Sequence, residues 1–232
     1  MADSSTDASA NTWIVVPAYN EAAVIATAVH GVRARFDNIV VVDDCSADDT
    51  QHFALAAGAH VVRHPVNLGQ GAAIATGIAY ALRHGAEAVV TFDADGQHSV
   101  ADAEAMVARL QQGDVDVVLG SRFLGRTFGM SAARHALLTL AVRFTRLTTG
   151  LPLTDAHNGL RALSRRAAET IRIRQNRMAH ASEILEQIAA HRLRIAEVPC
   201  TIIYTDYSRA KGQRWTGAFA ILADLATRRL YR

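Results

Sequence analysis

The feature that most constrains the fold of this chain is an alternation of short, valine-rich apolar runs with segments of helical periodicity. Continuous apolar runs between amphipathic helices are typical of a mostly parallel sheet that helices cover on both faces. In the first half we predict strands over 13–19, 38–44, 60–64, 87–93 and 115–121, separated by helices over 21–35, 48–57, 70–84 and 100–112. The sequence therefore predicts a Rossmann-like α/β fold.

The second half of the chain has a less regular pattern. We predict helices over 131–147, 180–191 and 215–231, a strand over 159–164, and strands over 193–199 and 201–205 that Pro199 separates. Residues 1–12 are small and polar, which favours a flexible tail. Because no linker or internal repeat divides the remainder, residues 13–232 are predicted to form a single domain.

Polar residues are concentrated at the carboxyl ends of the predicted strands, where ligands bind in open parallel sheets. They are Tyr19, Asn20 and Glu21 after the first strand, Asp43 and Asp44 on the second, Asn67, Gly69 and Gly71 after the third, and Asp93, Asp95 and Gln97 on the fourth. The sequence therefore predicts a ligand site on this edge of the sheet.

Asp93 and Asp95 are the candidate metal ligands. They lie on the same side of an extended segment, and two like carboxylates repel unless a cation lies between them. Mg²⁺ and Mn²⁺ prefer such oxygen ligands and often share them with substrate phosphates, and Gln97 can add a neutral oxygen. The alternative is a pair of exposed turn aspartates.

The segment "NLGQGAAIATG" contains a glycine turn that leads into a predicted helix. Gly69 and Gly71 begin like the dinucleotide fingerprint G-x-G-x-x-G, but Ile74 breaks the pattern and the segment follows the third strand instead of the first. Such a turn still lets the backbone approach a nucleotide. A plain tight turn is the alternative.

The charges divide the chain into an acidic and a basic half. Residues 1–116 hold 5 Arg and 15 Asp or Glu, whereas residues 117–232 hold 18 Arg, 1 Lys and 7 Asp or Glu. A carboxylate-rich half suits a metal ion, and an arginine-rich half suits phosphates or an anionic surface. A solvated basic surface is the simpler alternative.

Three further observations bear on location and partners. No run approaches the roughly 18–20 apolar residues of a membrane span, and the 2 cysteines fit neither a zinc site nor a disulfide framework. We therefore expect a cytoplasmic protein, or one attached peripherally to the cytoplasmic face of a membrane through its closing helix, 215–231. The arginines between 165 and 177 are predicted to form a solvated or membrane-facing surface, and no nucleic-acid partner is expected because no aromatic residues interleave with them.

Several motifs resemble those of a known family when they are read in order. "VVPAYNEA", "VVDDCSADDT", "NLGQGAAIATG", "FDADGQH" and "GSRF" are similar to segments of family-2 glycosyltransferases, which have the GT-A fold. "TDAHNGLRALSR" and "SEILEQIAAHRLRIAEVPCTIIY" resemble the dolichol-phosphate mannose synthases and related polyprenyl-phosphate glycosyltransferases. The resemblance runs from about Trp13 to Gln213 and departs from the family at Cys45, where Gly, Asn or Ser is usual, and at "NGLRA", which replaces the commoner "SGFRA".

The resemblance implies roles for individual residues. The implied nucleotide-binding residues are Pro17, Tyr19, Glu21, Asp43, Asp44, Asn67, Gly71 and Asp93. The implied ligands of Mg²⁺ or Mn²⁺ are Asp93, Asp95 and Gln97. The implied catalytic residues are Arg122 and Arg134, which would meet the acceptor, and Asp155, which would be a general base or an orienting carboxylate. A loop aspartate that makes an Asx turn is the alternative for Asp155.

The resemblance implies an inverting transfer of a sugar from a nucleoside-diphosphate sugar to a polyprenyl phosphate. The alternative acceptor is a saccharide hydroxyl in polysaccharide or cell-envelope glycan synthesis. A nucleotidyltransferase would normally carry a glycine-rich, arginine-containing loop after the first strand, and "PAYNEA" is not such a loop. An inactive scaffold would be expected to have lost the metal aspartates, which are present.

Overall fold

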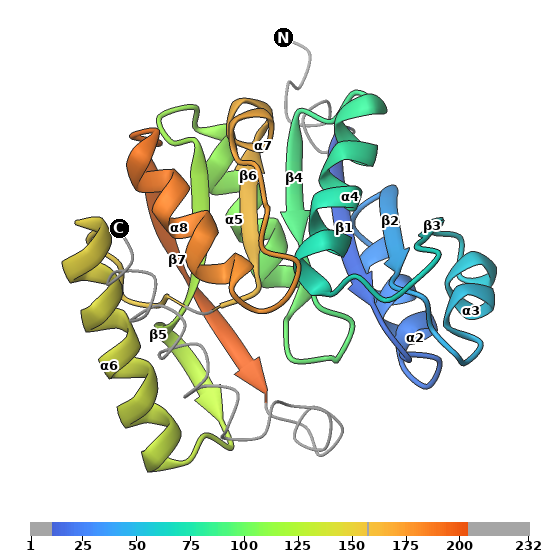
Figure 1. Ribbon diagram of the computed structural model, residues 1–232, viewed down its shortest axis with the longest axis horizontal. Helices are drawn as coiled ribbons and strands as arrows, with labels where there is room; N and C mark the ends of the chain where they lie inside the picture. The colour runs from blue at the N-terminus through green and yellow to red at the C-terminus, as the bar shows by residue number, and fades with distance from the viewer. Residues whose placement is uncertain (1–10, 157, 204–232) are drawn as a thin grey trace, which may run out of the picture.

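The computed structural model describes residues 11–156 and 158–203, and these form a seven-stranded mixed sheet with helices on both faces (Figure 1). The strands are β1 (Thr12–Ala18), β2 (Asn38–Asp43), β3 (His60–Arg63), β4 (Ala88–Thr91), β5 (Val117–Phe128), β6 (Arg161–Ser164) and β7 (Ile195–Ile203). The helices are α2 (Ile25–Arg33), α3 (Thr50–Ala56), α4 (Gln70–Arg83), α5 (Val100–Gln111), α6 (Ala132–Thr149), α7 (Arg165–Thr170) and α8 (His180–Ala190). The predicted α/β class is confirmed.

The strands lie in the order β3-β2-β1-β4-β6-β5-β7. Strands β1, β2, β3 and β4 are mutually parallel, so their carboxyl ends meet at one edge, the lower edge in Figure 1. This edge, called the rim below, carries the loops that follow these four strands. The structure therefore brings the predicted polar clusters to one side of the sheet.

Strand β6 runs antiparallel to both of its neighbours, β4 and β5. An antiparallel strand begins where its neighbours end, so the residues just before β6 arrive at the rim. Asp155 lies in that incoming loop. The reversal thus adds residues of the second half of the chain to the site that the first half builds.

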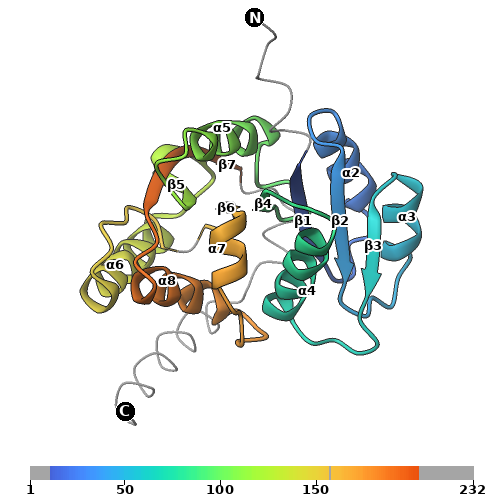
Figure 2. The ribbon, with the colours of Figure 1, turned by 90° about the horizontal axis from the view of Figure 1, so that it is seen from above.

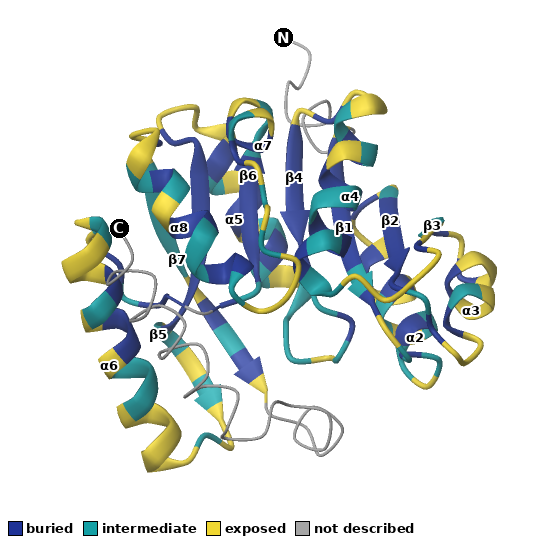
Figure 3. Cartoon of the chain, in the orientation of Figure 1, coloured by how far each residue is buried: buried dark blue, intermediate teal, exposed yellow. Residues whose placement is uncertain are grey.

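Two apolar cores lie on the two faces of the sheet (Figure 2). Helices α2, α3 and α5 cover one face, and α4, α7 and α8 cover the other. Strand β4 is buried along its whole length, and β1 and β6 are buried at all but one residue each (Figure 3). Gly77 lets α4 lie close to β1, because a Cβ there would clash with the side chain of Val15.

The second half differs from prediction in three elements. Strand β5 extends to Phe128, well past its predicted end. Strand β7 continues through Pro199, so the predicted interruption is wrong; β7 is an edge strand, where the missing N–H of a proline costs no ladder bond. Helix α7 was not predicted, and its Arg165 and Arg166 form ion pairs with Glu169 and Asp116.

The tail was predicted over residues 1–12; residues 1–10 lie outside the described residues, whereas Thr12 is buried and begins β1. The predicted closing helix over 215–231 also lies outside the described residues. Within 11–156 and 158–203, no helix combines the length and the apolar character that a membrane crossing needs.

Candidate active site

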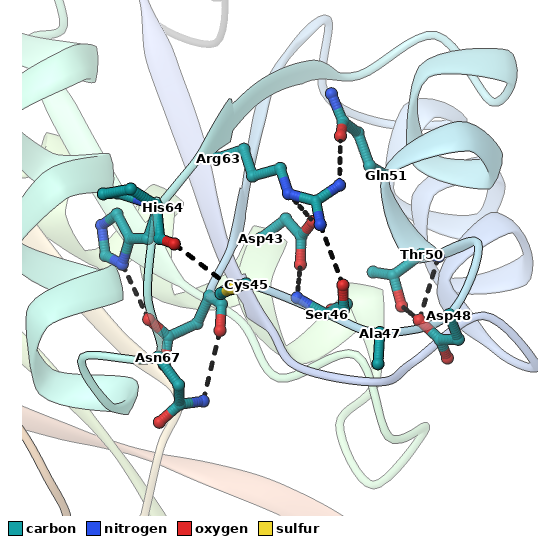
Figure 4. A network of polar contacts seen from close by, with 12 residues as sticks. Asp43, Cys45, Ser46, Ala47, Asp48, Thr50, Gln51, Arg63, His64 and Asn67 are labelled. Atoms are coloured by element: carbon teal, nitrogen blue, oxygen red, sulfur yellow. Dashed lines mark hydrogen bonds and ion pairs between the residues drawn. The ribbon is translucent and has the colours of Figure 1, made fainter.

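Hydrogen bonds of rim residues connect the loops after β1 and β2. Asn20 adopts a φ of 52°, its backbone N–H donates to Ser46 Oγ (2.9 Å), and its Oδ1 accepts from the Ala47 N–H (2.9 Å). Asp43 accepts from the Ser46 N–H at 2.9 Å and lies 3.6 Å from Arg63 Nε (Figure 4). The buried Asp43 therefore acts within the turn, and its predicted contact with a nucleotide stays a prediction.

Asp44 organises the loop that follows β3. Its Oδ1 accepts from the Leu68 N–H (2.9 Å) and lies 2.7 Å from His64 Nδ1, and its Oδ2 accepts from the Gly69 N–H (2.7 Å). Its backbone carbonyl accepts from Asn67 Nδ2 at 3.2 Å. We infer that Asp44 shapes the loop, so any contact it makes with a base or ribose is additional to this role.

The glycine turn packs against the segment that precedes α8. Gly69 has a φ of 103°, and a Cβ on Gly69 or Gly71 would clash with the backbone carbonyls of Asn176 or Gln175. The Gly71 N–H donates to the Asn176 carbonyl at 2.8 Å. The two glycines thus allow a close backbone contact, and the N–H of Gly71 is engaged within the chain. The implied role of Gly71 in nucleotide binding stays a prediction.

Asp93 lies at the centre of a polar cluster. Its Oδ1 accepts from Gln70 Nε2 (2.9 Å), and its Oδ2 lies 3.4 Å from His98 Nε2. A Cβ on Gly159 would clash with the same carboxylate. Burial opposes ionisation of Asp93, but contact with His98 and the charges of His98, His180 and Arg161 together hold its pKa below its ordinary value.

Asp95 is the second carboxylate of the predicted metal site. It accepts from the Gln97 N–H at 3.0 Å and from the Gln97 side-chain amide. Burial and the charge of Asp93 raise the pKa of Asp95, which is the repulsion that a bound cation would relieve. Among residues 11–156 and 158–203 no cluster of three or more His, Cys, Asp or Glu could hold a metal. The metal site of Asp93, Asp95 and Gln97 stays a prediction.

Arg122 and Asp155 form a buried ion pair. Asp155 Oδ2 accepts from Arg122 Nε at 2.6 Å and from the Arg122 N–H at 3.1 Å. The Glu197 carboxylate accepts from the backbone N–H groups of Thr154 (2.8 Å) and Asp155 (3.1 Å), which fixes the loop that carries Asp155. The donors of Arg122 thus engage Oδ2 of Asp155, and the choice between an orienting carboxylate and a general base stays a prediction.

The other predicted residues differ in their surroundings. Tyr19 is 45% exposed, whereas Glu21 is buried and its N–H donates to Thr50 Oγ1 at 2.7 Å. Pro17 lies on β1 opposite Val42 of β2, near the end of the strand. Arg134 is exposed in the first turn of α6, a helix that lies beyond α8 at the edge of the molecule (Figure 2).

Sequence reasoning missed residues that surround the predicted carboxylates. They are Gln70, His98, Arg161, His180 and Glu197. His98 lies within "FDADGQH" and Arg161 within "NGLRALSR", so both could have been proposed as site residues from their place in these motifs. Glu197 and His180 gave no signal, because only the pairing of β7 with β5 and the packing of α8 on α4 bring them to the site.

Comparison with known proteins places this arrangement in a class. A structure of glucosyl-3-phosphoglycerate synthase from Mycobacterium tuberculosis, in complex with Mn²⁺, uridine diphosphate and glucosyl-3-phosphoglycerate, superposes with a TM-score of 0.67 at 23% identity, covering 83% of this chain and 70% of that one. The fold is therefore that of the GT-A glycosyltransferases.

Sequence comparison narrows the class to a family. The profile described as "Glycosyl transferase family 2" matches residues 13–172. An uncharacterised protein of Methanocaldococcus jannaschii is 35% identical over 94% of this chain and 92% of its own length. The UDP-N-acetylglucosamine–dolichyl-phosphate N-acetylglucosaminyltransferase of Methanococcus voltae is 32% identical over 92% of this chain and 94% of its own. The chain belongs to glycosyltransferase family 2.

Proposed function

We propose that this enzyme transfers a sugar, with inversion, from a nucleoside-diphosphate sugar to a polyprenyl phosphate at the cytoplasmic surface of a membrane. The observation that carries the proposal is the buried pair of Arg122 and Asp155. A hydroxyl acceptor needs a general base to take its proton. A phosphate monoester has its second pKa near 6 and is already an anion at neutral pH, so it needs cations and alignment instead.

The donor half of the site is assigned to the loops after β1, β2, β3 and β4. Asp93 and Asp95, with an oxygen from Gln97, would hold Mg²⁺ or Mn²⁺. Bound there, the ion would supply Lewis-acid stabilisation of the diphosphate. The Methanococcus voltae relative is named for a UDP-sugar donor and a dolichyl-phosphate acceptor, which supports the same classes of substrate here.

The proposed reaction is a single displacement. An oxygen of the acceptor phosphate forms a bond to the anomeric carbon, and the bond from that carbon to the diphosphate oxygen breaks. The electron pair leaves with the nucleoside diphosphate, and the configuration at the carbon inverts. The chain's contribution is to hold the two reactants in line, with Arg122 oriented by Asp155 toward the acceptor.

Helix α6 supports a peripheral contact with an anionic membrane. It carries Arg134, Arg143 and Arg146 and contains no acidic residue. Leu140 and Leu147 are 56% and 84% exposed, and they lie seven residues apart on one side of the helix. Exposed apolar and basic side chains on one helix are the features of interfacial binding.

The proposal is tested by screening UDP- and GDP-sugars, beginning with UDP-N-acetylglucosamine, for release of free nucleoside diphosphate with and without polyprenyl phosphate. We expect release and a sugar-linked lipid only when both substrates are present. Arg122→Gln should lower this transfer. Arg109→Gln, which replaces a partly exposed arginine of α5, should not. Transfer to a saccharide hydroxyl, with polyprenyl phosphate neither accepting nor competing, would replace the proposal with the hydroxyl-acceptor reaction.

The membrane contact has its own test in cosedimentation with anionic vesicles. Leu140→Glu with Leu147→Glu should release the protein from the vesicles. Leu55→Glu on α3, a leucine that is 52% exposed on another helix, is the matched control and should not. Equal binding by the two variants would remove α6 from the proposal.

A further inference from the structure

Arg161 is a buried cation for which the described part of the chain supplies no hydrogen-bond or ion-pair partner. It is 3% exposed, yet within residues 11–156 and 158–203 its guanidinium makes no hydrogen bond and has no carboxylate within 4.0 Å. Burial lowers the pKa of Arg161 to about 10, and the charges of Asp93 and Asp155 act against that shift. The side chain therefore remains positively charged at neutral pH.

The position of Arg161 lies between the two halves of the site. On β6 it is opposite Thr91 of β4 on one side and Leu119 of β5 on the other. Asp93 follows Thr91 by two residues, and Arg122 follows Leu119 by three. The charges that act on Arg161 are those of Asp93, from the donor side, and Asp155, from the acceptor side.

The charged groups Arg122 and Asp93, which lie near Arg161, have hydrogen-bond partners within the chain. Arg122 donates through Nε to Asp155, and Asp93 accepts from Gln70. His180, whose charge interacts with that of Arg161, is itself buried, and burial together with Arg161 lowers its pKa to about 4, so it is neutral at physiological pH. It brings no negative charge to Arg161.

A buried charge without hydrogen bonds is unfavourable, so such a group points to an anion that arrives with a ligand. Arginine is well suited to a phosphate, because its planar fork can donate two parallel hydrogen bonds to two oxygens. On the basis of the proposed function, we propose that Arg161 binds a phosphate group of a substrate between the donor and acceptor halves of the site. That phosphate belongs either to the donor diphosphate, where negative charge develops during transfer, or to the acceptor monoester.

The test compares Arg161→Gln and Arg161→Lys with the wild type, using Arg165→Gln at the partly exposed start of α7 as the matched control. Calorimetry with Mg²⁺ measures the affinity for UDP and GDP and for the corresponding nucleosides. Steady-state kinetics measure the KM for polyprenyl phosphate. Loss of a charge-assisted hydrogen bond should weaken phosphate binding roughly tenfold or more.

A loss of diphosphate affinity with unchanged nucleoside affinity would assign Arg161 to the donor. A raised KM for polyprenyl phosphate with unchanged diphosphate affinity would assign it to the acceptor. Unchanged values in both measurements would overturn the proposal. The donor result can hold even if polyprenyl phosphate proves not to be the acceptor, so failure of the proposed function is distinguishable from failure of this inference.

Arg161→Lys separates phosphate binding from a structural role. Lysine keeps the charge beside Asp93 and Asp155 but lacks the planar fork. If Arg161 were only a counter-charge, the lysine variant should recover the melting temperature and every affinity. We expect it to recover the melting temperature while phosphate binding stays impaired, and full recovery of both would overturn the proposal even if Arg161→Gln fails to fold.

Discussion

The buried pair of Arg122 and Asp155 offers the sharpest test of how this site works. The Arg122 and Asp155 side chains are 7% and 1% exposed, and Nε and Oδ2 are 2.6 Å apart. Removal of one member takes the buried counter-charge from the other, which costs roughly 3–5 kcal/mol, whereas replacement of both by apolar residues of similar volume is often close to neutral. Asp155→Leu should therefore be far more destabilising than Arg122→Met combined with Asp155→Leu.

Thermal unfolding of the single and double variants measures this difference in stability. For a chain of this size 1 kcal/mol corresponds to roughly 2–4 °C in melting temperature, so Asp155→Leu should unfold roughly 6–20 °C below the wild type. The exposed pair of Arg109 and Asp114, with N–O distances of 2.5 and 2.9 Å, is the matched control. The coupling within this exposed pair should be much weaker, because water screens it. Additive effects of Arg122→Met and Asp155→Leu would refute the reasoning.

The same pair decides between the two roles of Asp155 in catalysis. Asp155→Asn retains an oxygen that can accept from Arg122 but cannot serve as a base. If Asp155 orients Arg122, the variant should raise the KM for polyprenyl phosphate and leave kcat within about tenfold of the wild-type value. A fall in kcat of roughly 10²–10⁴ at constant KM is the result expected of a general base, and it would contradict the orienting role.

Four further predictions follow from single residues. Excess EDTA, or Asp95→Asn, should abolish sugar transfer while circular dichroism stays unchanged; activity in EDTA would contradict the metal site. Asp44→Ala should lower both the melting temperature and the calorimetric affinity for nucleotide, because its carboxylate holds the loop after β3; a loss of affinity alone would show a purely direct contact. His180 has a pKa of about 4 in the native protein and about 6.5 in the unfolded chain, so between these pH values it is protonated only when the chain is unfolded. The free energy of unfolding should therefore fall by up to about 3 kcal/mol as the pH drops through this range. Denaturant titrations of His180→Asn should show a shallower decline. Cys45 has a φ of 63°, so the free energy of unfolding of Cys45→Gly should exceed that of Cys45→Ala by about 1 kcal/mol. Equal melting temperatures of the two variants would exclude backbone strain at this position.

Much of the donor half of this protein could be predicted from the sequence. Apolar runs and helical periodicity are local properties, and they predicted β1 to β4 and the helices between them. Parallel strands place their carboxyl ends at one edge, so the alternation alone was enough to bring Asp44 and Asp93 to the same rim. The resemblance in motif order added the family, which the comparisons confirm.

The tertiary structure decided what the local pattern does not encode. The antiparallel insertion of β6 between β4 and β5 depends on pairing between segments far apart in sequence, and it brings Arg161 into the centre of the site. The engagement of Asp155 by Arg122, and of Gly71 by the carbonyl of Asn176, likewise follows from packing between distant loops. A sequence shows which residues can carry charge, but whether a charge is paired, exposed or buried without a partner is set by its neighbours in space.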